Sequence, residues 1–296
     1  MKRVLITGRN SFIGVSFEKW VQNYHSQELK VETLDMIDAA WREFDFSVYD
    51  IVLHVAGIAH VDIKKTDEKR QKKYYEINTD LAVEACKKAK AEGVKQFIFM
   101  SSAIIYGESA QTGKQKKISK ETIPCPAGHY GNSKWLADQG VRELADDSFT
   151  VSVIRSPMVY GKGCKGNYQT LSLISRKMIV FPDVNNERSM LYIDNLCEFL
   201  CQIAIKGEGG VFWPQNKNCV STSDLVREIA AARGHKILVN KVFNWIPAMA
   251  SLVPGKMKKL SQKAFGSLSY DMTISDYDFE YRVVDFKTSI ERTEGK

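Results

Sequence analysis

A tyrosine and a lysine four residues apart have the chemistry needed for proton transfer. They are Tyr130 and Lys134 in the segment "HYGNSKW", and on a helix this spacing places both side chains on one face. A free tyrosine has a pKa of about 10, too high for proton exchange at neutral pH. An ammonium group one turn away favours the phenolate and lowers that pKa. The pair is therefore suited to act as general acid and base on an alcohol or ketone.

A serine upstream of this pair completes a possible reaction centre. Ser101 and Ser102 end the apolar run "FIFMSS", which predicts a strand. Ligands bind beyond the carboxyl ends of strands in open α/β sheets. The Ser102 hydroxyl can hydrogen-bond the oxygen that gains or loses the proton. Together with Tyr130 and Lys134, it predicts hydride transfer between an alcohol or ketone carbon and a nicotinamide, with Lys134 also reaching the cofactor ribose.

A glycine-containing turn near the N-terminus predicts where the dinucleotide binds. In "VLITGRNSFIG", Gly8 permits a sharp turn out of a strand, and Gly14 lets the following helix pack closely on the sheet. Between them, a glycine is usual at the position of Ser11, because it lets the backbone approach a pyrophosphate at the helix N-terminus. Serine is small and its hydroxyl can donate to a phosphate. We therefore expect the site to tolerate Ser11.

An acidic residue at the end of the next predicted strand indicates which dinucleotide is bound. Asp35 ends the run "VETLD", 21 residues after Gly14. A carboxylate in this place accepts hydrogen bonds from the adenosine ribose hydroxyls and repels a 2′-phosphate. The sequence thus predicts NAD rather than NADP.

Alternating strands and helices must position these residues. Apolar runs rich in β-branched and aromatic residues predict strands at 3–8, 30–35, 50–57, 95–102 and 150–157. Helical periodicity predicts helices at 12–24, 77–93 and 133–145. Such βαβ units imply an α/β fold with a doubly wound parallel sheet covered on both faces.

The rhythm changes after Pro157, where loops lengthen and helical pieces follow. We expect a dinucleotide-binding domain at 1–156 plus about 186–218, and a smaller substrate-binding lobe at about 157–185 and 219–296. Residues 62–73 are predicted to form a charged surface loop or the start of a helix.

One amphipathic stretch, 242–260, has the composition of a segment that touches a membrane. Pro247 and Pro254 interrupt any long helix in it, so packing on the smaller lobe is the favoured interpretation.

Composition places the chain in the ordinary globular class. Its 296 residues are 44% hydrophobic and 26% charged, with no apolar run of the roughly 20 residues that a membrane span needs. No signal-peptide core is present, so a cytoplasmic location is expected. The net charge of +7 suits phosphorylated ligands, whereas no motif indicates nucleic acid.

The cysteines form no CxxC pair, and we expect buried, reduced thiols and no metal site. They are Cys86, Cys125, Cys164, Cys197, Cys201 and Cys219.

Taken together, these motifs resemble the extended short-chain dehydrogenases/reductases, specifically the NAD-dependent epimerase/dehydratase group, over nearly the whole chain. The matching segments are "TGRNSFIG", "HVAG", "YYEIN", "SSAIIYG", "YGNSK" and "IRSPMVYGKG". The resemblance implies a Rossmann fold with NAD as cofactor and Ser102, Tyr130 and Lys134 as catalytic residues. The residues that it implies around NAD, besides Tyr130 and Lys134, are Gly8, Ser11, Phe12, Ile13, Gly14, Asp35, Val55, Ala56, Gly57, Asn78 and Pro157.

The second half of the chain carries a narrower resemblance. "GNYQTL" and "NERSMLYIDNL" resemble the nucleotide-sugar clamp of UDP-hexose 4-epimerases, which implies that Asn167 and Arg188 hold the diphosphate and uridine of a UDP-sugar. "FGSL" is similar to enzymes that act on UDP-N-acetyl-6-deoxyhexoses in bacterial surface-polysaccharide pathways. A homodimer is an assembly that the resemblance allows.

Three functions remain open at this stage. The first is an NAD-dependent epimerase acting at C4 of a UDP-hexose or UDP-N-acetylhexosamine through a 4-keto intermediate. The second is an NAD(P)H-dependent reductase of a UDP-4-keto-6-deoxy-N-acetylhexosamine, which would use the same three residues. The third is a non-catalytic dinucleotide sensor, which has no need of the Tyr130–Lys134 pair.

Two other features bear on the reaction. Sugar 4,6-dehydratases carry an Asp-Glu pair directly after the active-site hydroxyl residue, whereas this chain has Ala103 and Ile104, so dehydration is disfavoured. His54 is expected to be a packed residue at a strand end, and His60 is a candidate to approach the substrate.

Overall fold

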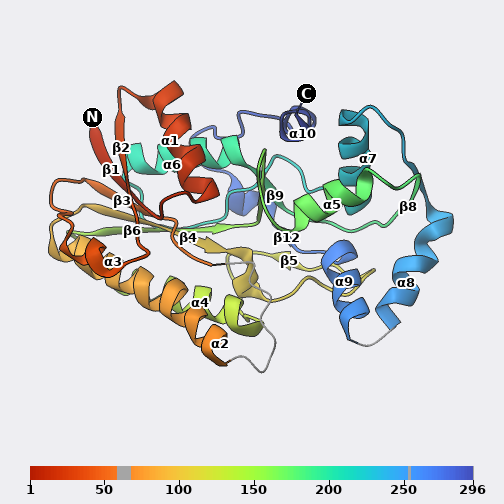
Figure 1. Ribbon diagram of the computed structural model, residues 1–296, viewed down its shortest axis with the longest axis horizontal. Coiled ribbons are helices and arrows are strands. Elements are labelled where there is room, and N and C mark those ends of the chain that lie inside the picture. The colour runs from red at the N-terminus through yellow and green to blue at the C-terminus, as the bar shows by residue number, and fades with distance from the viewer. Residues whose placement is uncertain (59–67, 253–254, 296) are drawn as a thin grey trace.

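The computed structural model describes residues 1–58, 68–252 and 255–295, and a six-stranded parallel sheet lies at its centre (Figure 1). Its strand order is β10-β6-β4-β3-β1-β2, and every neighbouring pair is parallel. The strands are β1 (Lys2–Thr7), β2 (Leu29–Leu34), β3 (Ile51–His54), β4 (Gln96–Ser102), β6 (Thr150–Ser156) and β10 (Gly210–Phe212). The prediction of a doubly wound α/β sheet is confirmed.

Helices cover both faces of the sheet, which explains why its strands are continuously apolar. In β1, Val4 and Ile6 belong to one core cluster while Leu5 between them belongs to another. The helices on the first face are α1 (Phe12–Trp20) and α6 (Ile193–Lys206). Those on the second face are α3 (Leu81–Ala91) and α4 (Gly128–Arg142), with α2 (Glu68–Tyr75) packed on α4 (Figure 1).

Some predicted helices differ in detail from the observed ones. The helix predicted at 12–24 continues beyond α1 as a π-helical turn, Val21–His25, and another π turn, Glu76–Asp80, leads into α3. Residues 68–73 of the predicted charged segment begin α2. This helix has little apolar surface of its own, and it is held by tertiary contacts such as that of the Tyr74 ring, 6.0 Å from the ring of Tyr130.

The later part of the chain builds a smaller layer beside the carboxyl ends of the strands. Its helices are α5 (Asn167–Ser175), α7 (Thr222–Ala232), α8 (Trp245–Leu252), α9 (Lys256–Phe265) and α10 (Phe286–Glu294). Its parallel two-stranded pairs are β7 (Met158–Tyr160) with β9 (Met190–Tyr192), β8 (Val180–Pro182) with β11 (Leu238–Asn240), and β5 (Lys117–Ile118) with β12 (Ser269–Tyr270). The last pair ties the C-terminal segment to the long loop that follows β4.

The cysteines are free thiols, but not all of them are buried. Cys86, Cys164, Cys197 and Cys201 lie in the cores, as expected from their apolar surroundings. Cys125, in contrast, is exposed in the loop before α4, and Cys219 is half-buried, so the expectation of burial is wrong for these two residues. No helix in the described ranges is long and apolar enough to cross a bilayer.

Candidate active site

Helix α4 presents Tyr130 and Lys134 to the end of β4. Lys134 is buried, and its Nζ donates a hydrogen bond to the main-chain oxygen of Met100 over 2.7 Å. The same nitrogen lies 4.6 Å from the centre of the Phe99 ring, a cation–π distance. The two contacts hold the ammonium group against the strand that ends in Ser102.

Tyr130 and Ser102 are brought together by this packing. The Ser102 hydroxyl lies close enough to the Tyr130 phenol to act to lower the Tyr130 pKa. Burial is the larger effect, because it penalises the charged phenolate, and it raises the pKa of Tyr130 to about 12. The expectation that Lys134 lowers this pKa is therefore not met in the free protein.

Lys134 is shifted in the direction opposite to Tyr130. Burial disfavours its ammonium form and lowers the pKa of Lys134 to about 8, although Asp138, one turn further along α4, acts in the other direction. The lysine is therefore mostly charged at pH 7, and it loses its charge as the pH rises past about 8.

The glycine turn has the close contacts that its sequence predicts. Gly8 has a φ of 127°, and a Cβ there would lie 2.8 Å from the nitrogen of Ala56. At Gly14 a Cβ would lie 3.1 Å from Cγ2 of Ile6, so this glycine allows α1 to approach β1. A larger residue at position 8 would displace the main chain at Ala56, whereas one at position 14 would displace the side chains of Ser11 and Ile6.

Ser11 has a role in this turn that the sequence analysis does not identify. It is the N-cap of α1, and its Oγ accepts a hydrogen bond from the Gly14 N–H over 3.0 Å. The side chain thus satisfies one of the free N–H groups at the start of the helix. Its own hydroxyl hydrogen remains available as a donor, which agrees with a phosphate-binding turn.

Asn78 organises the backbone that follows β3. Its amide is buried in the π turn and binds Ile58 twice, accepting from the N–H over 2.8 Å and donating to the oxygen over 3.0 Å. A third bond, of 3.1 Å, runs from Asn78 to Ser133, a buried residue of α4 that the sequence analysis missed. A Cβ on Gly57 would lie 3.0 Å from Oδ1 of Asn78 and 3.7 Å from Nζ of Lys134. The predicted segment 55–57 therefore lies beside Lys134.

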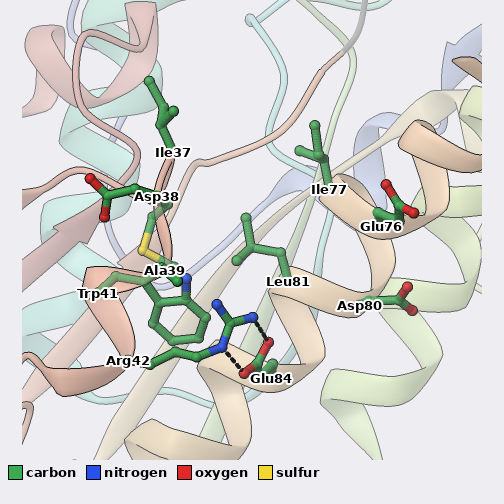
Figure 2. A pocket seen from close by; sticks show the side chains of 11 residues that line it. Ile37, Asp38, Ala39, Trp41, Arg42, Glu76, Ile77, Asp80, Leu81 and Glu84 are labelled. Carbon is green, nitrogen blue, oxygen red and sulfur yellow. Dashed lines mark hydrogen bonds and ion pairs between the residues drawn. The ribbon is translucent and has the colours of Figure 1, made fainter.

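A pocket of about 340 Å³ opens next to Asp35, beyond the end of β2. Asp35 itself accepts a hydrogen bond from the Ile37 N–H over 3.0 Å. Figure 2 shows that Trp41 and Leu81 give the pocket apolar walls, and that Arg42 and Glu84 form an ion pair at its side. The carboxylates in its lining are Asp38, Glu76, Asp80 and Glu84.

His54 is a packed residue at the end of β3, as expected. Its side chain is fully buried, with Nδ1 2.8 Å from the hydroxyl of Thr7 and its ring near-parallel to the rings of Phe97 and Phe99. Burial, together with the nearby charge of Lys134, lowers the pKa of His54 to about 3. The ring is neutral at physiological pH. His60 lies outside the described residues.

A buried ion pair behind the site was not predicted from the sequence. Asp138 is fully buried, and Arg155 on β6 binds both of its carboxylate oxygens, over 3.0 and 2.9 Å. Ser101 donates to the same carboxylate over 2.8 Å. The signals in the sequence were a carboxylate one turn after Lys134 and an arginine inside the apolar run "VSVIRSP".

This ion pair also connects the sheet to the C-terminal part of the chain. Arg155 donates to the hydroxyl of Tyr106 over 2.8 Å, and Trp213 donates to the same oxygen over 2.8 Å. The hydroxyl of Tyr270 in turn donates to the main-chain oxygen of Arg155 over 2.7 Å. The network therefore ties Ser101, next to Ser102, to three separate segments.

The predicted substrate residues lie in the smaller layer. Arg188 is buried, and its guanidinium donates to the main-chain oxygens of Lys263 and Ala264 at the end of α9. Within the described ranges it has no carboxylate partner, and burial lowers its pKa. Asn167 begins α5 and is exposed; in the described part of the chain no hydrogen bond joins it to Arg188.

Pro157 lies at the point where the sheet meets the smaller layer. It directly follows Ser156, which is paired with Ser102 in the register of β6 and β4. Pro157 is buried, and β7 begins immediately after it. The predicted cofactor-lining backbone at 157–159 is thus adjacent to Ser102, the predicted catalytic serine.

Comparisons with known proteins agree with this geometry. A model of the NAD dependent epimerase/dehydratase family matches residues 4–212. The UDP-glucose 4-epimerase of Vibrio cholerae is 32% identical, over 78% of this chain and 76% of that protein. An Escherichia coli O157:H7 protein, N-acetyl-alpha-D-glucosaminyl-diphospho-ditrans,octacis-undecaprenol 4-epimerase, is 25% identical over 67% of this chain and 61% of its own length.

The fold is also found in solved structures. A dTDP-4-dehydrorhamnose reductase from Clostridium acetobutylicum superimposes with a TM-score of 0.74 and covers 98% of both chains, at 16% sequence identity. At that identity the likeness concerns the fold alone.

Proposed function

Because this chain belongs to the NAD-dependent epimerase/dehydratase family, we propose that it interconverts the C4 epimers of a UDP-hexose or UDP-N-acetylhexosamine through a 4-keto intermediate. The observation that carries the proposal is the meeting of three side chains at the end of β4. The Ser102 hydroxyl acts on the Tyr130 phenol, and Lys134 lies one turn away from Tyr130 on the same helix. The 32% identity to a UDP-glucose 4-epimerase supports the same assignment.

The residues around the glycine turn fit a bound NAD, which supplies the hydride acceptor for the sugar carbon. The first turn of α1, capped by Ser11, would hold the pyrophosphate. Asp35 would accept from the adenosine ribose, and the pocket bounded by Trp41 and Leu81 would hold the adenine. The backbone that Asn78 fixes would line the nicotinamide side.

In the proposed reaction, Tyr130 takes the proton from O4 of the sugar as the C4 hydrogen leaves as hydride. Ser102 donates a hydrogen bond to the same oxygen. Because burial raises the Tyr130 pKa to about 12, the phenolate needs a neighbouring positive charge. Lys134 does not lower this pKa in the free protein, and we propose that its ammonium group acts on the phenolate once cofactor and substrate are bound. Return of the hydride to the other face of the flat 4-keto sugar, with a proton from Tyr130, completes the inversion.

Arg188 is the best candidate to hold the substrate's diphosphate. It is a buried cation without a carboxylate partner among the described residues, and it now binds only main-chain oxygens. A guanidinium group binds phosphate oxygens in a bidentate manner, which would provide the missing counter-charge.

The second candidate is reduction of a 4-keto sugar, an activity for which a protein of the same fold is named. Ser102, Tyr130 and Lys134 would serve that reaction without change. Dehydration is disfavoured, since Ala103 and Ile104 cannot transfer a proton.

The test begins with the nucleotide that the purified protein retains. Denatured protein is assayed for NAD(H) and NADP(H), and native protein is incubated with UDP-glucose, UDP-N-acetylglucosamine and a UDP-4-keto-6-deoxy-N-acetylhexosamine, with and without added NADH or NADPH. A polyprenyl-diphosphate-linked N-acetylglucosamine is added to the panel, because one relative is named for that substrate.

An epimerase retains NAD and equilibrates the C4 epimers without added cofactor. Stoichiometric oxidation of NADH or NADPH by the keto sugar alone would instead establish the reductase. Tighter retention of NADP(H) than of NAD(H) would contradict the role given to Asp35.

A further inference from the structure

The outer end of the smaller layer exposes a group of large apolar side chains. Strands β8 and β11 bring Ile179 and Leu238 together, since the Leu238 N–H donates to the Ile179 oxygen over 2.8 Å. Their side chains are 80% and 58% exposed. We call this group the apolar tip, and it consists of Ile179, Leu238, Val242, Trp245, Ile246 and Met249.

Helix α8 continues the apolar tip from the strands. Trp245 and Met249 are four residues apart, so they share one face of the helix, and they are 64% and 56% exposed. The 3-10 turn before α8 is fastened to the end of β8, because Asn244 donates to the main-chain oxygen of Asp183 over 2.8 Å. In Figure 1, α8 and β8 lie at the end of the molecule far from the central sheet.

Positive charge predominates around the apolar tip, with Asp183, directly after β8, as an acidic neighbour. The sequence contains no aspartate or glutamate at 148–182 or at 229–270, the two stretches that supply the tip. Lys177, Lys236 and Lys241 are neighbours of tip residues in the sequence, and all three are exposed. An apolar surface with exposed tryptophan and surrounding lysines is the composition of segments that lie in the interface of a bilayer.

A second copy of this chain is a poorer occupant, because pairing two such surfaces would bring lysines of like charge together. A bilayer containing anionic phospholipids satisfies both features, since its acyl region takes the apolar side chains and its headgroups attract the lysines. We propose that the apolar tip docks peripherally on an anionic membrane surface. This inference is independent of the sugar reaction proposed above.

The test is sedimentation of the full-length protein with vesicles of phosphatidylcholine alone or with 40% phosphatidylglycerol, an amount chosen on the order of natural anionic contents. We expect binding to the anionic vesicles that weakens as salt is raised, because exposed charges are screened. Lys241→Glu should weaken this binding by roughly tenfold, and the double variant Trp245→Ser with Met249→Ser by about tenfold or more.

Ile123→Ser is the control, because the Ile123 side chain is also largely exposed, at 83%, but lies in the loop before α4. It should bind vesicles as the unchanged protein does. Equal binding by the tip variants, or no binding of the unchanged protein to anionic vesicles, would overturn the proposal. A dimer in solution that the tip variants dissociate, without any vesicle binding, would assign the surface to a second copy instead. Nucleotide content, measured on every variant, shows that the dinucleotide site is intact.

Discussion

Lys134 donates its hydrogen bond to Met100 from inside the protein, so its charge is held by a main-chain oxygen and the Phe99 ring rather than by water. The pKa of this lysine falls from 10.5 to about 8. Between these two values the unfolded chain binds more protons than the folded one, so stability rises with pH across this interval. Below about pH 8 the full cost of burying the charge is present.

Lys134→Met should therefore make the cofactor-stripped protein more stable at pH 7, by up to about 3 kcal/mol. The advantage should shrink as the pH rises from 8 to 10.5, and cofactor affinity should fall at every pH. Urea unfolding at several pH values measures the first effect, with Lys87→Met, an exposed lysine of α3, as the control. A loss of stability that does not vary with pH would contradict the prediction.

Tyr130→Phe removes the proton acceptor with little change of shape. Turnover of the sugar should fall by roughly 10²–10⁴-fold or more, which is the usual contribution of general acid–base catalysis. Ser102→Ala should lower turnover as well, while NAD binding persists in both variants. Steady-state kinetics and circular dichroism are the measurements, and near-native turnover in folded Tyr130→Phe would eliminate the proposed mechanism.

Ser11 caps α1 and is small. Two replacements should therefore distinguish loss of the cap hydrogen bond from obstruction of the turn by a larger side chain. Ser11→Gly should reduce stability by only a few tenths of a kcal/mol, roughly, and leave NAD affinity nearly unchanged. Ser11→Leu should weaken NAD binding severely, because a bulky side chain would occupy the approach to the helix N-terminus. Calorimetric titration of stripped protein tests this, and tolerance of leucine would mean that the pyrophosphate does not contact the turn.

The buried pair of Asp138 and Arg155 should be costly to break. Asp138→Asn leaves the buried charge of Arg155 without its carboxylate, and Arg155→Met leaves the carboxylate of Asp138 without this guanidinium. Each change should reduce stability by about 3–5 kcal/mol. The double variant Asp138→Leu with Arg155→Met should lose less than the sum of the two single changes. Denaturant unfolding measures this coupling. The exposed pair of Lys72 and Glu76, 3.6 Å apart, is the control and should show no measurable coupling.

His54 should contribute to the acid sensitivity of the fold. Its pKa is about 3 in the folded protein and 6.5 in the unfolded chain, so the unfolded chain takes up the proton first. Stability should therefore fall as the pH decreases from 6.5 towards 3. His54→Gln should reduce this slope, whereas His129→Gln, at an exposed histidine, should retain it. The measurement is the thermal midpoint against pH, and identical slopes would contradict the assignment.

Local features of the sequence were sufficient to predict the sheet and to propose the reacting side chains. The strands and most helices follow from periodicity, and the spacing of Tyr130 and Lys134 places them on one face of α4 whatever packs around it. Gly8 and Gly14 likewise indicate a turn, because few other residues permit such close backbone contacts. These properties depend on neighbours within a few residues, which the sequence displays directly.

Only the tertiary structure determined which groups become partners and how far burial removes them from solvent. The carboxylate of Asp138 meets Arg155 only because α4 packs against β6, and burial reverses the expected shift of the Tyr130 pKa. The exposed face around Trp245 is another case, since the sequence favours packing of this segment on the smaller lobe, whereas the Trp245 side chain is 64% exposed. Desolvation and partner choice depend on segments distant along the chain, so local spacing does not determine them.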